Sequence, residues 1–221
     1  MFALFKDRNE AGRLLAARLR NEGCGKQTVV LGLPRGGVPV ASEVASALGA
    51  ELDVLPVRKI GVPGHGELAM GAIASGGALH VEHDTMEAAL VTQAQFDAVL
   101  ARERAELTRR EAAYRGDRPP ASVEGRTVLL VDDGLATGST MKAAILALRA
   151  RHPARIIAAL PVAPAGIEAQ FEDLADDFVC VAQPALFFSV GQHYEDFGET
   201  TDDDVRALLK RAWNDNAGQA R

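Results

Sequence analysis

Two adjacent carboxylates followed by a run of small and hydroxyl-bearing residues form the segment of this chain best suited to chemistry. Asp132 and Asp133 directly follow the apolar run 128–131, which predicts a strand buried on both faces. A helical pattern begins at Met141, after the loop. Backbone N–H groups at a helix start suit a phosphate monoester, and the carboxylates suit a diol or a magnesium ion. The segment therefore predicts a phosphosugar site whose phosphate-binding residues are Ala136, Thr137, Gly138, Ser139 and Thr140.

A second cluster with phosphate-binding character follows the predicted strand 27–33 and consists of Arg35, Gly36 and Gly37. Glycine lets a backbone approach a polyanion closely, and arginine donates bidentate, charge-assisted hydrogen bonds to phosphate oxygens. Because this loop and the aspartate pair each follow a strand, we expect both to face one crevice. Both clusters also have a purely structural interpretation. The Arg35 loop would be a tight turn with a solvated arginine, and the two aspartates would only cap the next helix.

Basic and glycine residues follow the second predicted strand, 52–57, and indicate a flexible flap over about 58–82. Such a lid excludes water, and its basic side chains neutralise the charge of a leaving group. The residues that we expect to act from the flap are Arg58, Lys59, His65 and Glu67. The alternative is a solvated hairpin, because most loops only connect elements.

Aromatic residues gather in segment 183–197, which contains four of them. Aromatic side chains stack on flat ring systems, and neighbouring polar groups hydrogen-bond the edges of such rings. We therefore expect a small ligand-binding segment, named the hood, over about 183–200, with contacts from Phe188, Gln192, Tyr194, Asp196 and Phe197. Packing into the core is the alternative for these aromatic rings.

The elements that must position these clusters alternate between strand and helix, which predicts an α/β fold with a doubly wound, mostly parallel sheet. Predicted strands cover 27–33, 52–57, 128–131, 155–162 and 178–181, and predicted helices include 38–48, 141–151 and 166–174. The charged segment 85–114 predicts one long, partly exposed helix, and a terminal helix follows Thr201. Residues 1–221 are expected to form a single domain, since no segment marks a boundary.

Composition argues against several classes of function. The net charge is −6 and the pI is about 5.4, which speaks against binding of nucleic acid or of an anionic membrane. No apolar run approaches the length of a membrane span, and the N-terminal residues lack the apolar core of a signal peptide. Cys24 and Cys180 have no metal-ligand spacing and are expected to be reduced thiols. A cytoplasmic location is therefore expected.

The apolar run, the two aspartates and the small-Thr-Gly-Ser-Thr loop together resemble the phosphoribosyl pyrophosphate (PRPP) motif of the type I phosphoribosyltransferases. The resemblance extends over about 27–197 and looks closest to family members that are uncharacterised. It implies that Asp132 and Asp133 bind the ribose 2- and 3-hydroxyls and contact Mg²⁺ only indirectly, through those hydroxyls or water. The loop 136–140 would surround the 5-phosphate.

The same resemblance assigns Arg35, Gly36 and Gly37 to the family's pyrophosphate loop, which contains a cis peptide bond in several relatives. In relatives a flap closes over the site, and a hood binds the acceptor. The implied activity is Mg²⁺-dependent transfer of the ribose 5-phosphate group of PRPP to a nitrogenous acceptor, with release of pyrophosphate. A homodimer is the implied assembly, and the implied catalytic residues are Arg35, Lys59, Asp132 and Asp133.

Two positions depart from the better-known relatives. Purine-specific members commonly carry an aspartate where this chain has Ala136, which leaves the role of general base to Asp196, Glu195 or Glu67, or to no carboxylate. Gly134 stands where many relatives have a branched apolar residue. Two alternatives stay open: a non-catalytic PRPP-sensing regulator, and a phosphoribosyl hydrolase or phosphorylase. The acceptor is open too, among purines, pyrimidines, pyridine carboxylates and other amines.

Overall fold

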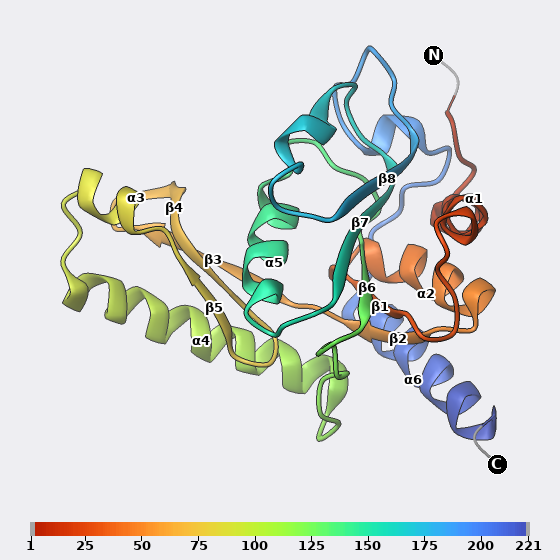
Figure 1. Ribbon diagram of the computed structural model, residues 1–221, viewed down its shortest axis with the longest axis horizontal. Coiled ribbons are helices and arrows are strands. Elements are labelled where there is room, and N and C mark those ends of the chain that lie inside the picture. Colours follow the sequence, from red (N-terminus) through yellow and green to blue (C-terminus); the bar gives the residue numbers. More distant parts are fainter. Residues whose placement is uncertain (1–2, 220–221) are drawn as a thin grey trace.

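The centre of the protein is a parallel sheet of five strands, in a computed structural model that describes residues 3–219, without the side chains of Glu67 and 216–219. The strand order is β2-β1-β6-β7-β8 (Figure 1). Every neighbouring pair in this sheet runs parallel. The strands are β1 Val29–Gly32, β2 Glu51–Val54, β6 Thr127–Val131, β7 Arg155–Val162 and β8 Asp177–Ala182. The predicted α/β fold is therefore confirmed.

Helices cover both faces of this sheet, as expected for a doubly wound fold. Side chains of α1 (Arg8–Asn21), α2 (Gly37–Leu48) and α6 (Asp202–Gln219) share one buried apolar cluster with the sheet. On the opposite face α5 (Ser139–Arg149) packs with Phe171, which follows the short 3₁₀ helix η1 (Ile167–Gln170). No helix within residues 3–219 combines the length and apolar character needed to cross a membrane.

The predicted helix 166–174 is wrong, because only the 3₁₀ turn η1 forms there. Phe171 N and Leu174 N each donate to the carbonyl three residues earlier, at 2.8 and 2.9 Å, as in 3₁₀ turns. The Leu174 carbonyl then accepts hydrogen bonds from the Arg149 guanidinium at 3.0 and 3.2 Å.

The segment predicted as a flap forms an ordered antiparallel sheet instead of a glycine-rich loop. Its strands are β3 Val57–Val62, β4 His65–Ala74 and β5 Ala78–Val81, and together with the two helices that follow they form the arm at the left of Figure 1. Ile60, Met70 and Phe96 form a small core inside the arm. The predicted strand 52–57 is correspondingly too long, since β2 ends at Val54, before Pro56, which cannot donate to a ladder.

The predicted single helix 85–114 is two helices, α3 (His83–Ala88) and α4 (Gln93–Arg115). Leu90 has a left-handed backbone with φ of 52°, which ends the first helix. Thr92 then starts the second with a capping box, in which its hydroxyl accepts from Gln95 N at 3.3 Å and its own N–H donates to Gln95 Oε1 at 2.9 Å. Local capping thus outweighs the continuous charged pattern.

A buried ion pair joins the arm to the central sheet. Arg115, at the end of α4, donates from Nε to Asp53 Oδ1 of β2 at 2.9 Å, and the two side chains are 3% and 4% exposed. Arg115 also donates from a terminal nitrogen to Ser75 Oγ, beyond β4, at 2.6 Å. Two other donors reach Asp53, the backbone N–H groups of Val54 and Ala121. This network fixes the position of the arm relative to β2.

Candidate functional site

The two predicted phosphate-binding loops meet at the topological switch point of the sheet. The chain leaves β1 for the edge strand β2 and later returns on the other side of β1 with β6, so β1 and β6 are neighbours. Ligands bind open α/β sheets at such a point, outside the carboxyl ends of the strands. Leu33 N donates to Val131 O at 2.8 Å, which holds the start of one loop against the start of the other.

Glycines are required where the Arg35 loop packs on the aspartate pair. A Cβ atom added to Gly36 would lie 2.0 Å from Asp133 Oδ2, and one added to Gly37 would lie 2.7 Å from a main-chain oxygen of β6. The peptide bond between Pro34 and Arg35 is cis. The predicted convergence of the two motifs on one crevice is therefore observed in atomic contact.

The two aspartates sit in surroundings that disfavour their charged forms. Asp132 Oδ1 accepts from Asp133 N at 2.9 Å. Burial, and next the neighbouring charge of Asp133, raise the pKa of Asp132 well above its ordinary value. Burial also raises the pKa of Asp133, and the Arg8 guanidinium opposes that rise. Paired buried carboxylates of this kind are typical of binding and catalytic sites.

The loop after the aspartates forms a polar pocket of about 210 Å³, lined by Asp132, Gly134 and residues 135–141. Helix α5 begins at Ser139, and its N-cap residue is Gly138, with φ of 75°. Glycine has no side chain to cap the first N–H groups, so these groups stay available to an anion at the positive end of the helix. Thr137 Oγ1 and Ser139 Oγ lie 3.3 Å apart at the same place.

Neighbouring basic residues of β3 point to different partners. Lys59 Nζ donates to Ser139 Oγ at 2.7 Å, which brings an ammonium group from the arm onto the predicted phosphate loop. Arg58 points to the other side of the strand and pairs with Glu103 of α4 at 2.6 Å. Arg58 therefore faces α4 in this structure, where its contact with Glu103 holds α4 on β3, and a role at the site stays a prediction.

Other predicted flap and loop residues lie at the edge of the site or away from it. His65 begins β4 at the tip of the β3–β4 hairpin and is exposed, while the Glu67 side chain lies outside the described part of the structure. Arg35 donates to Glu199 Oε1 at 2.6 Å, and its side chain is 45% exposed. This arginine therefore stands at the open side of the crevice.

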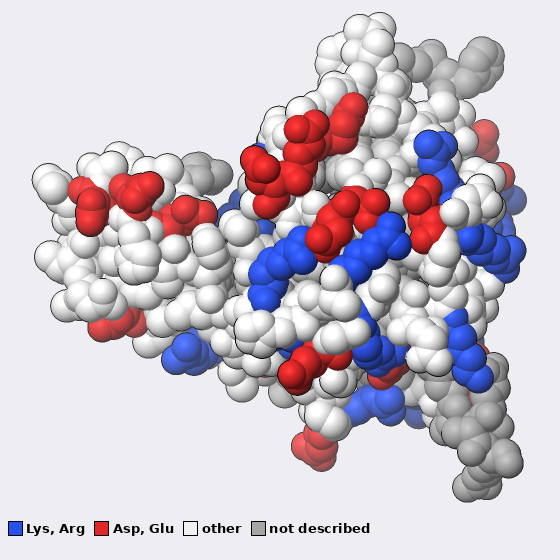
Figure 2. Space-filling view, in the orientation of Figure 1, with Lys and Arg blue, Asp and Glu red and all other residues white. Residues whose placement is uncertain are grey.

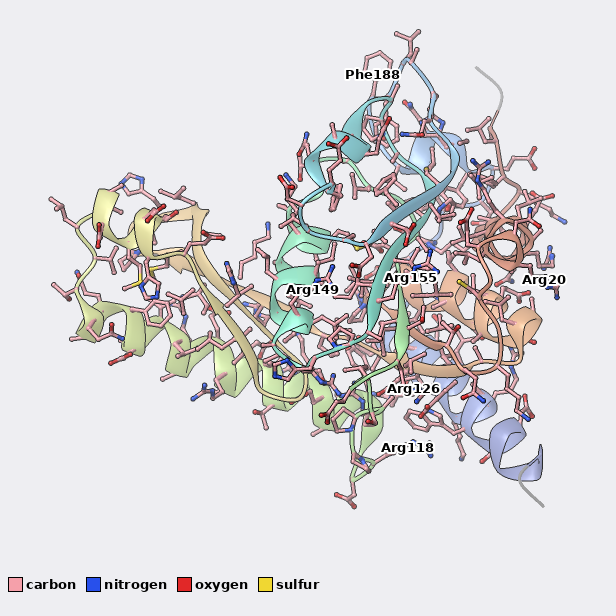
Figure 3. The ribbon with its side chains drawn as sticks, viewed as in Figure 1. Arg20, Arg118, Arg126, Arg149, Arg155 and Phe188 are labelled. Carbon is pink, nitrogen blue, oxygen red and sulfur yellow. The ribbon has the colours of Figure 1, made fainter. Side chains whose placement is uncertain are left out.

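The hood residues are only partly arranged as predicted. Phe188 is 81% exposed and projects outward from its loop (Figure 3). Tyr194 is instead buried, where its hydroxyl donates to Asp133 O at 2.5 Å. Gln192 contacts the His193 ring nitrogen at 2.9 Å, and Asp196 accepts from Gly198 N at 3.0 Å. For Tyr194 the packing interpretation is the one that the contacts favour.

Gly134 is explained by the hood. A Cβ atom added at this position would lie 2.5 Å from a methyl carbon of Val190. Val190 of the hood fills the space that a side chain at position 134 would need. Glycine at this position thus allows the hood to pack closely on the phosphate loop.

Sequence reasoning missed Arg8, the first residue of α1. Its Nε donates to Asp133 Oδ2 at 2.8 Å, across 125 residues of chain. A cation in the first turn of a helix is electrostatically unfavourable, because that end carries the positive end of the helix dipole. This unfavourable position at the helix start was the only local sign in the sequence that Arg8 pairs with a residue of another element.

Charges of both signs are mixed over the molecular surface shown in Figure 2, where lysine and arginine alternate with aspartate and glutamate. No continuous basic patch is visible on that face. The side chains of Arg149 and Arg155, labelled in Figure 3, are paired with Asp176 and Asp177 at 2.9 and 2.7 Å. On this face, basic side chains are thus interspersed with acidic ones.

Comparison with known proteins identifies the family. A Phosphoribosyl transferase domain matches residues 5–196. Two curated relatives from Mycobacterium tuberculosis, strains CDC 1551 and H37Rv, each named "Putative phosphoribosyl transferase", are 49% identical over 214 residues. These alignments cover 97% of this chain and 48% of each relative, so the chain spans about half the length of the curated relatives it matches.

A solved structure, that of TT1426 from Thermus thermophilus, is 44% identical, with a TM-score of 0.86. That match covers 94% of this chain and 98% of the other. Since the domain match includes the strands, the aspartate pair and both loops, the chain belongs to the phosphoribosyl transferase domain family.

Proposed function

We propose that this protein is a magnesium-dependent phosphoribosyltransferase that moves the ribose 5-phosphate group of PRPP to a nitrogenous acceptor and releases pyrophosphate. The observation that carries the proposal is the contact of Gly36 with Asp133, where an added Cβ would lie 2.0 Å from the carboxylate. This contact places the predicted pyrophosphate loop directly beside the predicted ribose-binding acids. PRPP carries its pyrophosphate on C1, next to the 2-hydroxyl, so the two subsites must adjoin.

A bound PRPP molecule would span three groups of residues. Its 5-phosphate would lie at the start of α5, against the loop 136–140 and the Lys59 ammonium that contacts Ser139. Its ribose hydroxyls would donate to Asp132 and Asp133. Its pyrophosphate would face Arg35, whose fork of donors suits phosphate oxygens. Asp132, Asp133, Arg35 and Lys59 are thus the residues on which we expect the reaction to depend.

The donor set fits a magnesium ion that is shared with the ligand. Within residues 3–219, three or more His, Cys, Asp or Glu side chains nowhere gather into a metal-binding group. Two carboxylates and the oxygens of a pyrophosphate, however, are the hard ligands that Mg²⁺ prefers. Asp132 and Asp133 would hold the ion indirectly, through the ribose hydroxyls or water. When bound, the ion supplies positive charge that stabilises the departing pyrophosphate.

Chemically, the acceptor nitrogen forms a bond to C1 of the ribose while the bond from C1 to the pyrophosphate oxygen breaks. The electron pair of that bond leaves with pyrophosphate, and Arg35 stabilises the negative charge. The acceptor's proton passes to a base or to water. Ala136 offers no carboxylate for this task, and the hood residue Asp196 is a candidate. Positioning and electrostatics supply most of the rate enhancement in such a site.

The test is magnesium-dependent release of pyrophosphate from PRPP, measured alone and with a panel of nucleobases and small amines. Release that one acceptor stimulates supports transfer and names the substrate. Release without any acceptor favours a hydrolase. Tight PRPP binding without release of pyrophosphate favours the PRPP-sensing regulator. The observation on its side is that Tyr194 and Gln192 of the hood are hydrogen-bonded within the protein. Light scattering on the same sample tests the proposed homodimer.

The matching variant combines Asp132→Asn with Asp133→Asn. Losing charged hydrogen bonds to the ribose should weaken PRPP binding about a hundredfold or more, as measured by calorimetry. A matched control combines Asp202→Asn with Asp203→Asn, an exposed pair of adjacent aspartates at the start of α6. Equal PRPP affinity in the first double variant and in the unaltered protein would contradict the proposed ribose subsite.

A further inference from the structure

Arg8 reaches the proposed ribose subsite from an element that the PRPP motif does not include. Its Nε donates to Asp133 Oδ2 at 2.8 Å, and one of its terminal nitrogens donates to Gly198 O at 2.8 Å. The two charged side chains are 13% and 14% exposed, so water screens the pair poorly. The ion pair and the second hydrogen bond together fix the position of the Arg8 guanidinium.

An aromatic stack holds the Arg8 guanidinium in place. Its central carbon lies 3.9 Å from the centre of the Phe197 ring, within the range of a cation–π contact. Phe197 stacks on Tyr194 with ring centres 5.0 Å apart, and Tyr194 contacts Phe5 at 5.3 Å. Stacking and pairing together leave the guanidinium little freedom to move.

The same stack also holds the main chain of Asp133. Tyr194 donates its hydroxyl proton to Asp133 O at 2.5 Å, while Arg8 holds the carboxylate. Gly36 closes off a further side of that carboxylate. Among the described residues, no hydrogen bond reaches Asp133 Oδ1. One oxygen of Asp133 is therefore fixed by the protein, and the other is left to accept from a ligand.

We propose that Arg8 is a positioning residue that orients Asp133 for a ribose diol, so that the N-terminal segment forms part of the phosphosugar site. The inference rests on the proposed function, because it assumes that Asp133 receives a ribose hydroxyl. An unheld carboxylate beside Asp132 would turn away from its like-charged neighbour. Arg8 opposes this by fixing Oδ2, which leaves Oδ1 as the oxygen that would accept a ribose hydroxyl.

The test uses calorimetric titration with two separate ligands, ribose 5-phosphate and pyrophosphate with magnesium. Arg8→Met keeps the length of the side chain and its packing on Phe197 but removes the charged donor. The expected result is a loss of ribose 5-phosphate affinity of about ten- to a hundredfold, with unchanged affinity for pyrophosphate. Equal losses for both ligands, or no loss for either, would overturn the proposal.

Two further variants separate positioning from charge and from folding. Arg13→Met removes an arginine from the same helix, where the side chain is 59% exposed and 3.6 Å from Glu43, and should change neither affinity. Arg8→Lys keeps the charge but lacks the planar fork that bonds Asp133 and Gly198 together, so we expect partial recovery. Full recovery of affinity in the lysine variant would overturn the proposal in favour of a role that needs only the positive charge.

A double-mutant cycle connects the effect to Asp133. In the background of Asp133→Asn, Arg8→Met should cost little additional ribose 5-phosphate affinity, because its partner is already altered. Additive losses would overturn the proposal. If the unaltered protein does not bind ribose 5-phosphate, the proposed function itself is contradicted. Its affinity is therefore measured before any variant is compared.

Discussion

Asp132 illustrates how a single residue of this site combines a functional benefit with a structural cost. The Asp132 carboxylate lies just after β6, beside a second acid and partly buried, and its Oδ1 accepts from the main-chain N–H of Asp133. Burial and the charge of Asp133 both work against its ionised form. A ligand that donates hydroxyl protons, or a magnesium ion nearby, would offset that cost. In the ligand-free protein this cost lowers the stability of the fold.

Asp132→Asn should therefore raise the free energy of unfolding of the ligand-free protein at pH 7, by about 0.5–2 kcal/mol. The raised pKa means that the folded protein binds more protons than the unfolded chain, so stability falls as pH rises from the ordinary value of 3.8 to the raised one. An amide has no such dependence, and the gain should vanish at about pH 4.

Urea unfolding at both pH values checks this expectation, in buffer without magnesium. Asp117→Asn, at an exposed position after α4, is the control and should change stability by less than about 0.5 kcal/mol. Lower stability of Asp132→Asn than of the unaltered protein at pH 7 would contradict the argument.

At the scale of elements, the position of the arm decides whether Lys59 reaches the phosphate loop. The arm's strands carry Lys59 toward Ser139 of α5 and Arg58 toward Glu103 of α4, so one strand contacts both helices. The buried pair Arg115–Asp53 fixes the arm at its base. An opening motion of this arm stays a prediction from the glycine-rich sequence, but its resting position is specified by polar contacts.

Asp53→Asn should destabilise the protein by about 3–5 kcal/mol, because Arg115 would stay buried without its charged partner. Urea unfolding measures the loss. Glu51→Gln in the same strand is the control: its pair with Arg126 at 2.7 Å is about 30% exposed on each side chain, and it should cost at most about 1 kcal/mol. Equal losses of stability in the two variants would show that the buried pair Arg115–Asp53 stabilises the fold no more than the more exposed pair does.

At the scale of the whole molecule, the N-terminal segment and the hood close the fold over the site. Phe5 and Tyr194 form an isolated parallel bridge, and Leu4 N and Phe5 N both donate to His193 O. Phe5 is 3% exposed, within a cluster that also contains Val162 of β7. The N-terminal segment and the hood thus share one small core beside Asp133.

Phe5→Ala should leave a cavity in that core and cost about 3–5 kcal/mol of stability. The neighbouring Leu4→Ala removes a side chain that is 46% exposed and should cost about 0.5 kcal/mol or less. Thermal unfolding of both variants compares them directly. Similar melting temperatures for the two variants would mean that packing of Phe5 against the hood does not stabilise the fold.

The chain's local pattern was sufficient to predict the central sheet and the loop that opens α5 at its edge. Apolar runs predicted the strands, with 155–162 matching β7 at both ends, and the residues after Val131 predicted an anion site at a helix start. These features depend on periodicity and on residues adjacent in sequence. The helix break at Leu90 and the short η1 turn were missed, since capping and side-chain bonds decided them.

Tertiary structure alone decided which side chains meet at the site. Lys59 and Arg58 are neighbours in sequence, yet only Lys59 faces the phosphate loop, because alternate residues of a strand point to opposite faces. Arg8 reaches Asp133 from the N-terminal segment and Tyr194 from the hood, across 125 and 61 residues. Sequence determined the residue types that we propose bind a phosphosugar, whereas contacts between distant segments determined how those residues are held.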